Sequence, residues 1–269
     1  MSHISFSELK EWTDCPWKHK LKYIDRIEKF KGNEYTAFGT ALHTVCEMIV
    51  TNNDKQAFDW SSYDAKGHFE KEFLLGLQNL KSADPSFAFN VGLVKDMRSQ
   101  GQHITQYILP ALEKRFGKFK LIGVEEKLFE SMKDIPTNFK GFIDLIIFTP
   151  SDNKYHVIDW KSCGWGWDSK KKTDKMITYQ LTLYKHFWCQ KHNKEYQDVI
   201  THFALLKRTA KKDHVEIFKV SNGPRKINNA LKLLNKALYN ISNKQYIKNR
   251  LSCYGKYGVC KFFNTKHCT

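Results

Sequence analysis

The sequence predicts a mixed α/β fold with a helical N-terminal part, and three observations support this. Up to about residue 115, apolar residues recur at intervals of three and four, which is typical of amphipathic helices. From residue 119 onward, short runs of β-branched and aromatic residues alternate with turn-forming clusters, which is typical of strands. Three such runs are followed by a helical stretch and two more runs, so the expected core is one mixed sheet flanked by helices.

The helical part begins with a capping-box pattern at Ser5 and Glu8, which predicts a helix start. The second helix follows the turn residues Gly32 and Asn33 and carries a continuous apolar stripe. The segment SADPS at 82–86 separates the third helix from the fourth. The four predicted helices cover residues 5–15, 34–50, 62–80 and 90–115.

The remaining elements follow in order, without an internal repeat or a low-complexity segment. Strands are predicted at residues 119–130, 140–149, 154–161, 199–207 and 214–220, and helices at 173–192 and 223–244. The expected organisation is a helical N-terminal part at residues 1–117, a core at 118–222, and a C-terminal helix with a cysteine-bearing tail at 223–269.

The composition favours a polyanionic partner. Lysine and arginine number 44 against 28 acids, which gives a net charge of +16. A surplus of this size favours nucleic acid or an anionic membrane, although a basic composition can also merely keep a protein in solution. The longest apolar run, LIIF, is far too short to span a bilayer, and the N-terminus lacks a secretory pattern. We therefore expect a cytoplasmic protein with reduced cysteines and no membrane partner.

A predicted hairpin brings two carboxylates together. Centring the turn TPSDNK between Ser151 and Asp152 places Asp144 opposite Asp159, with Cβ atoms about 5 Å apart. Facing carboxylates in apolar surroundings repel each other, and a divalent cation offsets that cost. Mg²⁺ typically takes one or two carboxylates and completes its shell with water and phosphate oxygens. The hairpin therefore predicts a Mg²⁺ site.

Lys161 lies two residues after Asp159, so both side chains leave the same face of the strand. Its ammonium can orient a metal-activated water, help to deprotonate it and screen developing charge. Together these groups suit metal-assisted hydrolysis of a phosphodiester. The alternative is an edge hairpin with ordinary solvated charges, because the pattern is short and degenerate.

The segment GFIDLIIFTPSDNKYHVIDWKS resembles the PD-(D/E)XK nuclease signature, with Asp144 as the first acid and Asp159, Trp160 and Lys161 as the D-x-K element. Ile143 stands where the signature has proline. The chain looks most like the RecB-type exonuclease branch, which includes AddB nucleases and CRISPR-associated adaptation nucleases. Four further segments match that branch in the expected order: SFSELKEWTDCP, GTALH, VEEKLF and QLTLY. The resemblance covers nearly the whole chain and implies a restriction-endonuclease-like fold.

Further site residues follow from the resemblance. His43 in GTALH corresponds to a metal ligand from the helical part, and an imidazole ligand favours Mn²⁺ alongside Mg²⁺; otherwise it is an ordinary helix histidine. In VEEKLF, Glu125 rather than Glu126 is expected to help hold the site or its water. Gln180 and Tyr184 lie on one helical face and correspond to a pair that positions the DNA strand. The alternative for Tyr184 is a place in the core.

Two tryptophans are candidates for DNA contact. Trp165 and Trp167 lie in SCGWGWDSKKKTDK, between glycines and before four lysines. Aromatic rings beside lysines suit base stacking and phosphate contact on a single strand. The alternative is a pair of core tryptophans followed by a solvated lysine run.

Four outlying cysteines are candidates for a cluster. Cys15 stands near the N-terminus, and Cys253, Cys260 and Cys268 lie in the tail. In iron–sulfur members of the branch, one N-terminal and three C-terminal cysteines hold a [4Fe–4S] cluster, and four thiolates are the right number. The tail spacing is C-x6-C-x7-C, whereas the commoner pattern is C-x2-C-x5-C. A zinc site near His267 and a metal-free tail remain alternatives.

These expectations combine into a Mg²⁺/Mn²⁺-dependent deoxyribonuclease, an exonuclease that acts on DNA ends or single strands. The chain lacks the G-x-x-x-x-G-K-[ST] pattern, so ATP-driven translocation would come from a helicase or recombination partner. One alternative is a non-catalytic DNA-binding or assembly subunit of a recombination or adaptation complex. That subunit is expected to have lost one of the three residues Asp144, Asp159 and Lys161, which are all present. A basic membrane-surface protein is a third reading, which the helix at 223–244 fits loosely.

Overall fold

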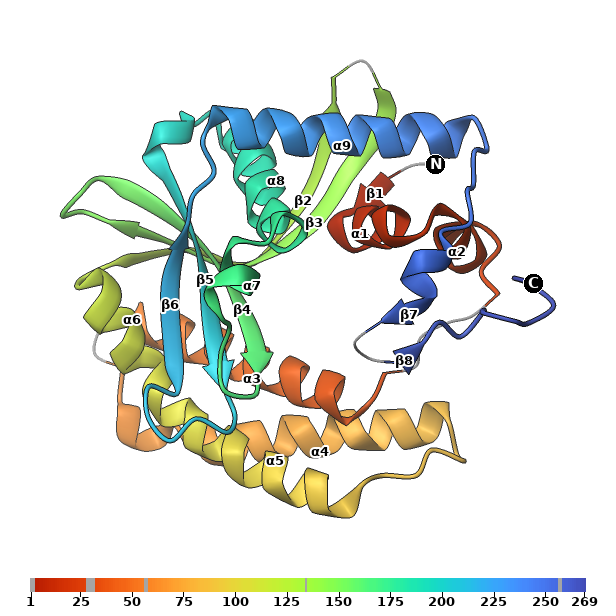
Figure 1. Cartoon of the computed structure of the whole chain (residues 1–269). Helices are drawn as coiled ribbons and strands as arrows, with labels where there is room; N and C mark the ends of the chain where they lie inside the picture. Colours follow the sequence, from red (N-terminus) through yellow and green to blue (C-terminus); the bar gives the residue numbers. More distant parts are fainter. Residues whose placement is uncertain (1–2, 28–31, 56–57, 134, 256–257) are drawn as a thin grey trace. The chain divides into compact units, whose positions relative to one another are not determined.

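The computed structural model describes residues 3–27, 32–55, 58–133, 135–255 and 258–269 (Figure 1). The chain forms two compact units. The terminal unit consists of Met1–Phe30, Phe129–Gly141 and Gly223–Thr269, and the central unit consists of Lys31–Leu128 and Phe142–Asn222. Each unit contains an apolar cluster of its own.

The helices of the first part of the central unit precede its sheet. They are α3 (Glu34–Asn53), α4 (Ala65–Ala83), α5 (Val91–Ile104) and α6 (Ile108–Phe116), with 3-10 turns at Trp60–Ser62 and Thr105–Tyr107. The helical region predicted near 90–115 therefore consists of α5 and α6 with a 3-10 turn between them. Pro110 supplies the reason, since a continuous helix needs an amide N–H at this position to bond the Gln106 carbonyl.

The central sheet is mixed, as predicted. Its strands are β2 (Lys120–Met132), β3 (Ile135–Thr149), β4 (Lys154–Cys163), β5 (Val199–Lys207) and β6 (Val215–Val220). β2 pairs with β3, the pairs β3–β4 and β5–β6 are antiparallel, and β4 and β5 are parallel. Parallel neighbours need a long crossover, which here contains α7 (Ser169–Thr173) and α8 (Lys175–His192).

The pleat of β4 separates core residues from polar ones. Ile158 and Trp160 belong to the main apolar cluster of the central unit together with residues of α3. Asp159 and Lys161 alternate with them and leave the opposite face of the strand. Helix α8 packs against β4 and β5, and its Gln180 bonds Asp159, so the polar face of β4 meets α8.

The terminal unit is built from distant parts of the chain. Its elements are β1 (His3–Ser5), α1 (Phe6–Asp14), α2 (Pro16–His19), a π-helical turn (Lys20–Ile24), α9 (Pro224–Ser242), a 3-10 turn (Arg250–Cys253), β7 (Tyr254–Gly255) and β8 (Gly258–Val259). Ser5 accepts a hydrogen bond from the Glu8 amide and caps α1, as the capping pattern predicts. Strand β1 pairs in parallel with β3, with Ile4 opposite Phe139. Helix α9 packs against α1.

Among the described helices, none combines the length and the apolar character that a bilayer crossing requires.

Candidate metal centre and active site

Strands β3 and β4 deliver the two aspartates. Leu145 pairs with Ile158, which is the register predicted from the turn, so Asp144 and Asp159 come next on their strands. The Asp159 residue is 1% exposed and the side chain of Asp144 is 12% exposed. Asp144 Oδ2 accepts a hydrogen bond from the Trp160 backbone N–H at 2.7 Å. This bond fixes one carboxylate oxygen and leaves the other for a ligand.

Electrostatic repulsion is concentrated at Asp144. Burial raises the pKa of Asp144 well above its usual value, and the neighbouring Asp159 carboxylate raises it further. The charged form is therefore costly unless a cation or a proton is bound. A divalent cation is the more effective partner near neutral pH, because it can be shared by several carboxylates.

His43 approaches the aspartates from α3. Its Nδ1 lies 3.7 Å from Asp144 Oδ2. Burial lowers the pKa of His43, although Asp159 opposes the shift, so the imidazole is mainly neutral at neutral pH. The neutral form is the one that binds metals. One ligand atom each from His43, Glu125 and Asp144 lie within 4.8 Å of one another.

Glu125 reaches this trio because β2 departs from regular geometry. Its φ of 45° lies in the left-handed region, which non-glycine residues rarely adopt, and the in–out alternation of β2 slips by one residue here. Such irregularities re-aim a side chain within a strand. The next residue, Glu126, points elsewhere and bonds Lys191 Nζ at 2.7 Å and His192 Nε2 at 2.6 Å on α8. The two adjacent glutamates thus have different surroundings.

Lys161 and Asp159 form an ion pair. Lys161 Nζ lies 2.6 Å from Asp159 Oδ2. Burial by itself would lower the pKa of Lys161, but the Asp159 and Asp144 carboxylates outweigh it, so the pKa is raised. The ammonium therefore stays protonated at neutral pH. In this form it can orient water and stabilise negative charge.

Gln180 and Tyr184 of α8 lie behind Asp159. Gln180 Nε2 donates to Asp159 Oδ1 at 2.9 Å and to the Tyr184 hydroxyl oxygen at 3.2 Å. Tyr184 is 7% exposed, and burial raises the pKa of its hydroxyl. In this structure the pair therefore holds the Asp159 carboxylate in position.

The two candidate tryptophans differ in exposure. Trp165 is 82% exposed. Trp167 packs against Phe203 and Phe218 of the sheet, with ring centroids 5.2 and 6.1 Å apart, and Lys171 Nζ lies 4.5 Å from its ring centroid. Stacking on a base is therefore open to Trp165, whereas Trp167 contributes mainly to packing.

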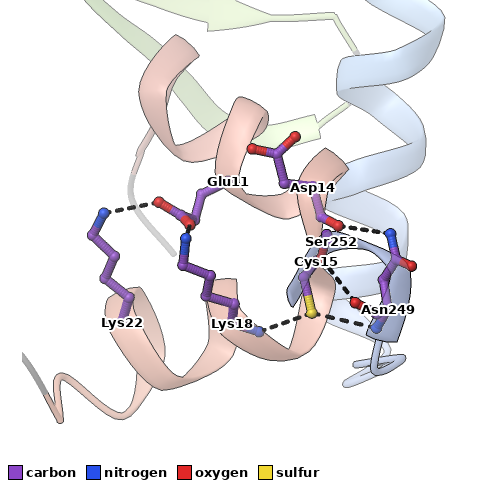
Figure 2. Close-up of polar contacts among 7 residues, drawn as sticks. All are labelled: Glu11, Asp14, Cys15, Lys18, Lys22, Asn249 and Ser252. Atoms are coloured by element: carbon purple, nitrogen blue, oxygen red, sulfur yellow. Dashed lines mark hydrogen bonds and ion pairs between the residues drawn. The ribbon is translucent and has the colours of Figure 1, made fainter. Parts of the chain in front are cut away.

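All four outlying cysteines lie in the terminal unit. Cys268 packs with Leu21 and Phe262, and Cys260 borders this cluster. Burial raises the pKa of Cys253, and the thiols of Cys260, Cys268 and Cys15 raise it further, so each of these three lies within electrostatic reach of Cys253. Cys15 Sγ accepts hydrogen bonds from the amides of Lys18 at 3.5 Å and Asn249 at 3.4 Å, which Figure 2 shows.

Sequence reasoning missed two groups at the site. One is the backbone N–H of Trp160, which holds Asp144. The other is Glu47, whose charge raises the pKa of Glu125 together with partial desolvation of that side chain. Glu47 follows His43 by four residues on α3, and this helical spacing is the signal that could have identified it.

The donor set fits a hard divalent cation. Two carboxylates and one neutral imidazole suit Mg²⁺ or Mn²⁺. The elevated pKa of Asp144 is the physical sign that a positive charge is needed at this point. The residues present therefore fit a divalent metal ion.

Comparison with known proteins gives a consistent result. Among solved structures, the crystal structure of a "Putative exonuclease" from Eubacterium rectale matches with a TM-score of 0.57 and 11% identity, covering 93% of this chain and 84% of that chain. At this identity the likeness concerns the fold, and it confirms the predicted mixed α/β architecture. No curated protein sequence matches the chain. The family model of the PD-(D/E)XK nuclease superfamily matches residues 3–262, nearly the entire length. The chain therefore belongs to the PD-(D/E)XK nuclease superfamily.

Proposed function

We propose that this protein is a Mg²⁺/Mn²⁺-dependent DNA exonuclease of the RecB/AddB-like branch that acts on DNA ends or single strands. The observation that carries the proposal is the convergence of His43, Glu125 and Asp144 beside the Asp159–Lys161 pair. The net charge of +16 supports a polyanionic substrate. A helicase or recombination partner would supply translocation along DNA.

Each side chain has a distinct role in this proposal. His43, Asp144 and Asp159 hold the divalent cation, which when bound polarises the scissile phosphate and lowers the pKa of water. Lys161 is protonated, so it stabilises negative charge that develops on the phosphate oxygens. Glu125 is exposed and has a raised pKa, so its carboxylate can accept a proton from the attacking water. Gln180 keeps the Asp159 carboxylate oriented.

The replacement Asp159→Ala tests the assignment. We expect it to abolish degradation of end-labelled single- and double-stranded DNA in Mg²⁺ or Mn²⁺, to the level seen with EDTA. Asp152→Ala is the matched control, because this acid lies in the turn of the same hairpin with a half-exposed side chain. Closed circular DNA should resist the wild-type protein if digestion starts at ends. Full activity of Asp159→Ala, or an inactive wild type that still binds DNA, would contradict the proposal.

We also propose that Cys15, Cys253, Cys260 and Cys268 hold a [4Fe–4S] cluster. Their gathering in one unit and the electrostatic influence of the other three thiols on Cys253 support this. Zinc bound in the same tail is the alternative, and the metal content of the purified protein distinguishes the two.

Anaerobic purification tests the cluster. We expect a brown protein with iron and acid-labile sulfide in equal amounts, and loss of both in Cys260→Ser. Cys163→Ser is the control, because Cys163 lies in the central unit. Stoichiometric zinc, or wild-type protein without iron, would contradict this assignment while leaving the nuclease assignment in place.

A further inference from the structure

The positive charge of this protein is concentrated in its last segment. Residues 223–269 contain ten lysines and arginines and no aspartate or glutamate. These 47 residues therefore carry +10 of the net charge of +16. None of the proposed catalytic residues lies in this segment, so the catalytic site does not account for its charge.

Helix α9 presents part of this charge as one stripe. Its buried face consists of Ile227, Ala230, Leu234, Ala237, Leu238 and Ile241. The exposed residues Arg225, Asn228, Lys232, Lys236 and Tyr239 follow one another at steps of three or four, so they share the opposite face. We call these five residues the α9 stripe. Tyr239, at its end, is 65% exposed.

A pocket adjoins the end of the α9 stripe within the terminal unit. Its volume is about 650 Å³, within the range of small-molecule sites. Tyr239 and Tyr246 line it together with Ile24, Pro136 and Leu238, and Asn235 and Lys244 add polar groups. The Tyr246 hydroxyl donates to the Ile241 carbonyl at 3.3 Å, which holds the Tyr246 ring in place.

We propose that the terminal unit binds single-stranded DNA, with the phosphates along the α9 stripe and a base in the pocket beside Tyr239. Cations and amides along one face suit a nucleic-acid backbone, and an aromatic ring at an apolar pocket suits base stacking. The acid-free sequence favours nucleic acid over an acidic or apolar protein segment, because a segment with ten lysines and arginines and no acid favours a dense polyanion. The inference rests on the proposed DNA substrate and assigns its second contact surface.

Binding is measured by fluorescence anisotropy with a labelled oligo-dT strand and the full chain. The Asp159→Ala background with EDTA removes turnover, so the binding result does not depend on catalysis. We compare Arg225→Ala/Lys232→Ala/Lys236→Ala with Lys66→Ala/Lys71→Ala/Lys95→Ala, a control that removes the same charge from exposed positions on α4 and α5. Thermal melts verify that each variant folds.

The salt dependence separates specific contact from general charge. Each phosphate contact on a single strand contributes about 0.7 to the slope of log K against log salt. Removing the three cations of the α9 stripe should therefore lower the slope by about 2. The control triple variant should leave it nearly unchanged. Equal slopes in the wild type and the stripe variant, or equal losses in both triple variants, overturn the proposal.

Tyr239 tests the base contact. Loss of one base stack costs about 1–3 kcal/mol, so Tyr239→Ala should weaken binding of oligo-dT by roughly five- to a hundred-fold. Tyr239→Phe should restore it, because stacking needs the ring and not the hydroxyl. An abasic strand of equal length should bind the wild type and Tyr239→Ala equally well.

The results distinguish this proposal from the nuclease assignment. Unchanged binding by Tyr239→Ala contradicts a base in the pocket, even if the protein degrades DNA. Tighter binding of duplex than of single strands, with no effect of Tyr239→Ala, points to a duplex surface and also overturns the proposal. Strand binding that depends on the α9 stripe in a protein without nuclease activity supports the surface and rejects only the proposed catalysis.

Discussion

Ionisation of the buried Asp144 carboxyl destabilises the folded protein when no metal is bound. It is buried beside Asp159, and both features raise its pKa. An acid whose pKa is raised by folding contributes full stability only below its unfolded-state pKa. That contribution is lost as the pH rises towards the folded-state value, so at neutral pH the metal-free protein bears the cost.

The replacement Asp144→Asn should therefore stabilise the metal-free protein. The amide keeps an acceptor for the Trp160 N–H and removes the charge, which is worth about 1.4 kcal/mol for each unit of pKa shift. We expect a higher melting temperature than wild type in EDTA and no further increase on adding Mg²⁺ or Mn²⁺. Wild type should show the metal-dependent increase. A lower melting temperature of the variant in EDTA would contradict this explanation.

His202, which lies away from the metal centre, contributes to stability with the opposite pH dependence. It is 1% exposed, its Nε2 lies 3.0 Å from His156 Nδ1, and burial lowers its pKa to about 3. A base whose pKa is lowered by folding contributes full stability above its unfolded-state pKa of 6.5, and this stability is lost as the pH falls towards 3. The protein should therefore lose stability in mild acid.

Replacing His202 by Gln should reduce the loss of stability that accompanies a fall in pH. Below pH 6.5 the free energy of unfolding of the wild type should fall by up to about 1.4 kcal/mol per pH unit more than that of His202→Gln. Urea denaturation across this pH range measures the difference. His68→Gln is the control, at a position on α4 where the imidazole contacts the Tyr63 hydroxyl. Its free energy of unfolding should change with pH as that of the wild type does. Parallel curves for wild type and His202→Gln would exclude the buried histidine as the cause.

The packing of α4 against α5 depends on one close approach. Gly101 of α5 faces Phe69 of α4, and a Cβ atom built at Gly101 would overlap the Phe69 ring. Phe69 is fully buried and stacks on Phe73 with centroids 5.7 Å apart, so it has little room to move. The two helices can approach this closely only because position 101 lacks a side chain.

Gly101→Ala should therefore lower stability by about 1–3 kcal/mol through overpacking. Gly92→Ala in the same helix is the control, because its Cβ would make only an ordinary contact with Asn90. That control should raise stability by up to about 1 kcal/mol, since alanine has the higher helix propensity. Chemical denaturation of both variants tests the prediction. Equal changes in the free energy of unfolding would show that helix propensity, rather than packing against Phe69, determines the effect of Gly101→Ala.

The two units of the chain are discontinuous in sequence, since each combines segments that are separated along the chain. The terminal unit combines three segments from both ends and from the β2–β3 connection. None of these segments can bury its apolar face without the others, whereas the central unit contains the larger apolar cluster. The units should therefore differ in their dependence on the last 47 residues.

A chain that ends at Asn222 should retain the central unit and lose the terminal one. Hydrogen exchange should show lost amide protection in α1, because α9 packs against it in the full chain. Protection in β4 and β5 should stay close to that of the full chain. Loss of protection in β5 as well would mean that the central unit does not fold without the tail.

Local sequence signals predicted most of the elements and the hairpin. The turn between β3 and β4 determined the register, and Leu145 does pair with Ile158. Asp144, Asp159 and Lys161 were identifiable because the hairpin register and the strand pleat are local, whereas His43 was identified through the family resemblance. Strand β1 was not predicted, because three residues carry too little periodic signal and its pairing with β3 spans more than 130 residues. The helical region near 90–115 is divided by a 3-10 turn, which Pro110 favours because it lacks the amide N–H that a continuous helix needs.

What the sequence by itself determined is therefore the order of elements, the facing aspartates and the family resemblance, since all of these depend on residues close in the chain. The sequence favoured Glu125 over Glu126, and the tertiary structure supplied the physical reason, because the positive φ of Glu125 changes which way the strand directs its side chains. Only the tertiary structure placed Gln180 behind Asp159 and the Trp160 N–H on Asp144. Such contacts join groups that are distant in sequence. They form, and burial and neighbouring charges shift the pKa values of these groups, only once the chain has folded.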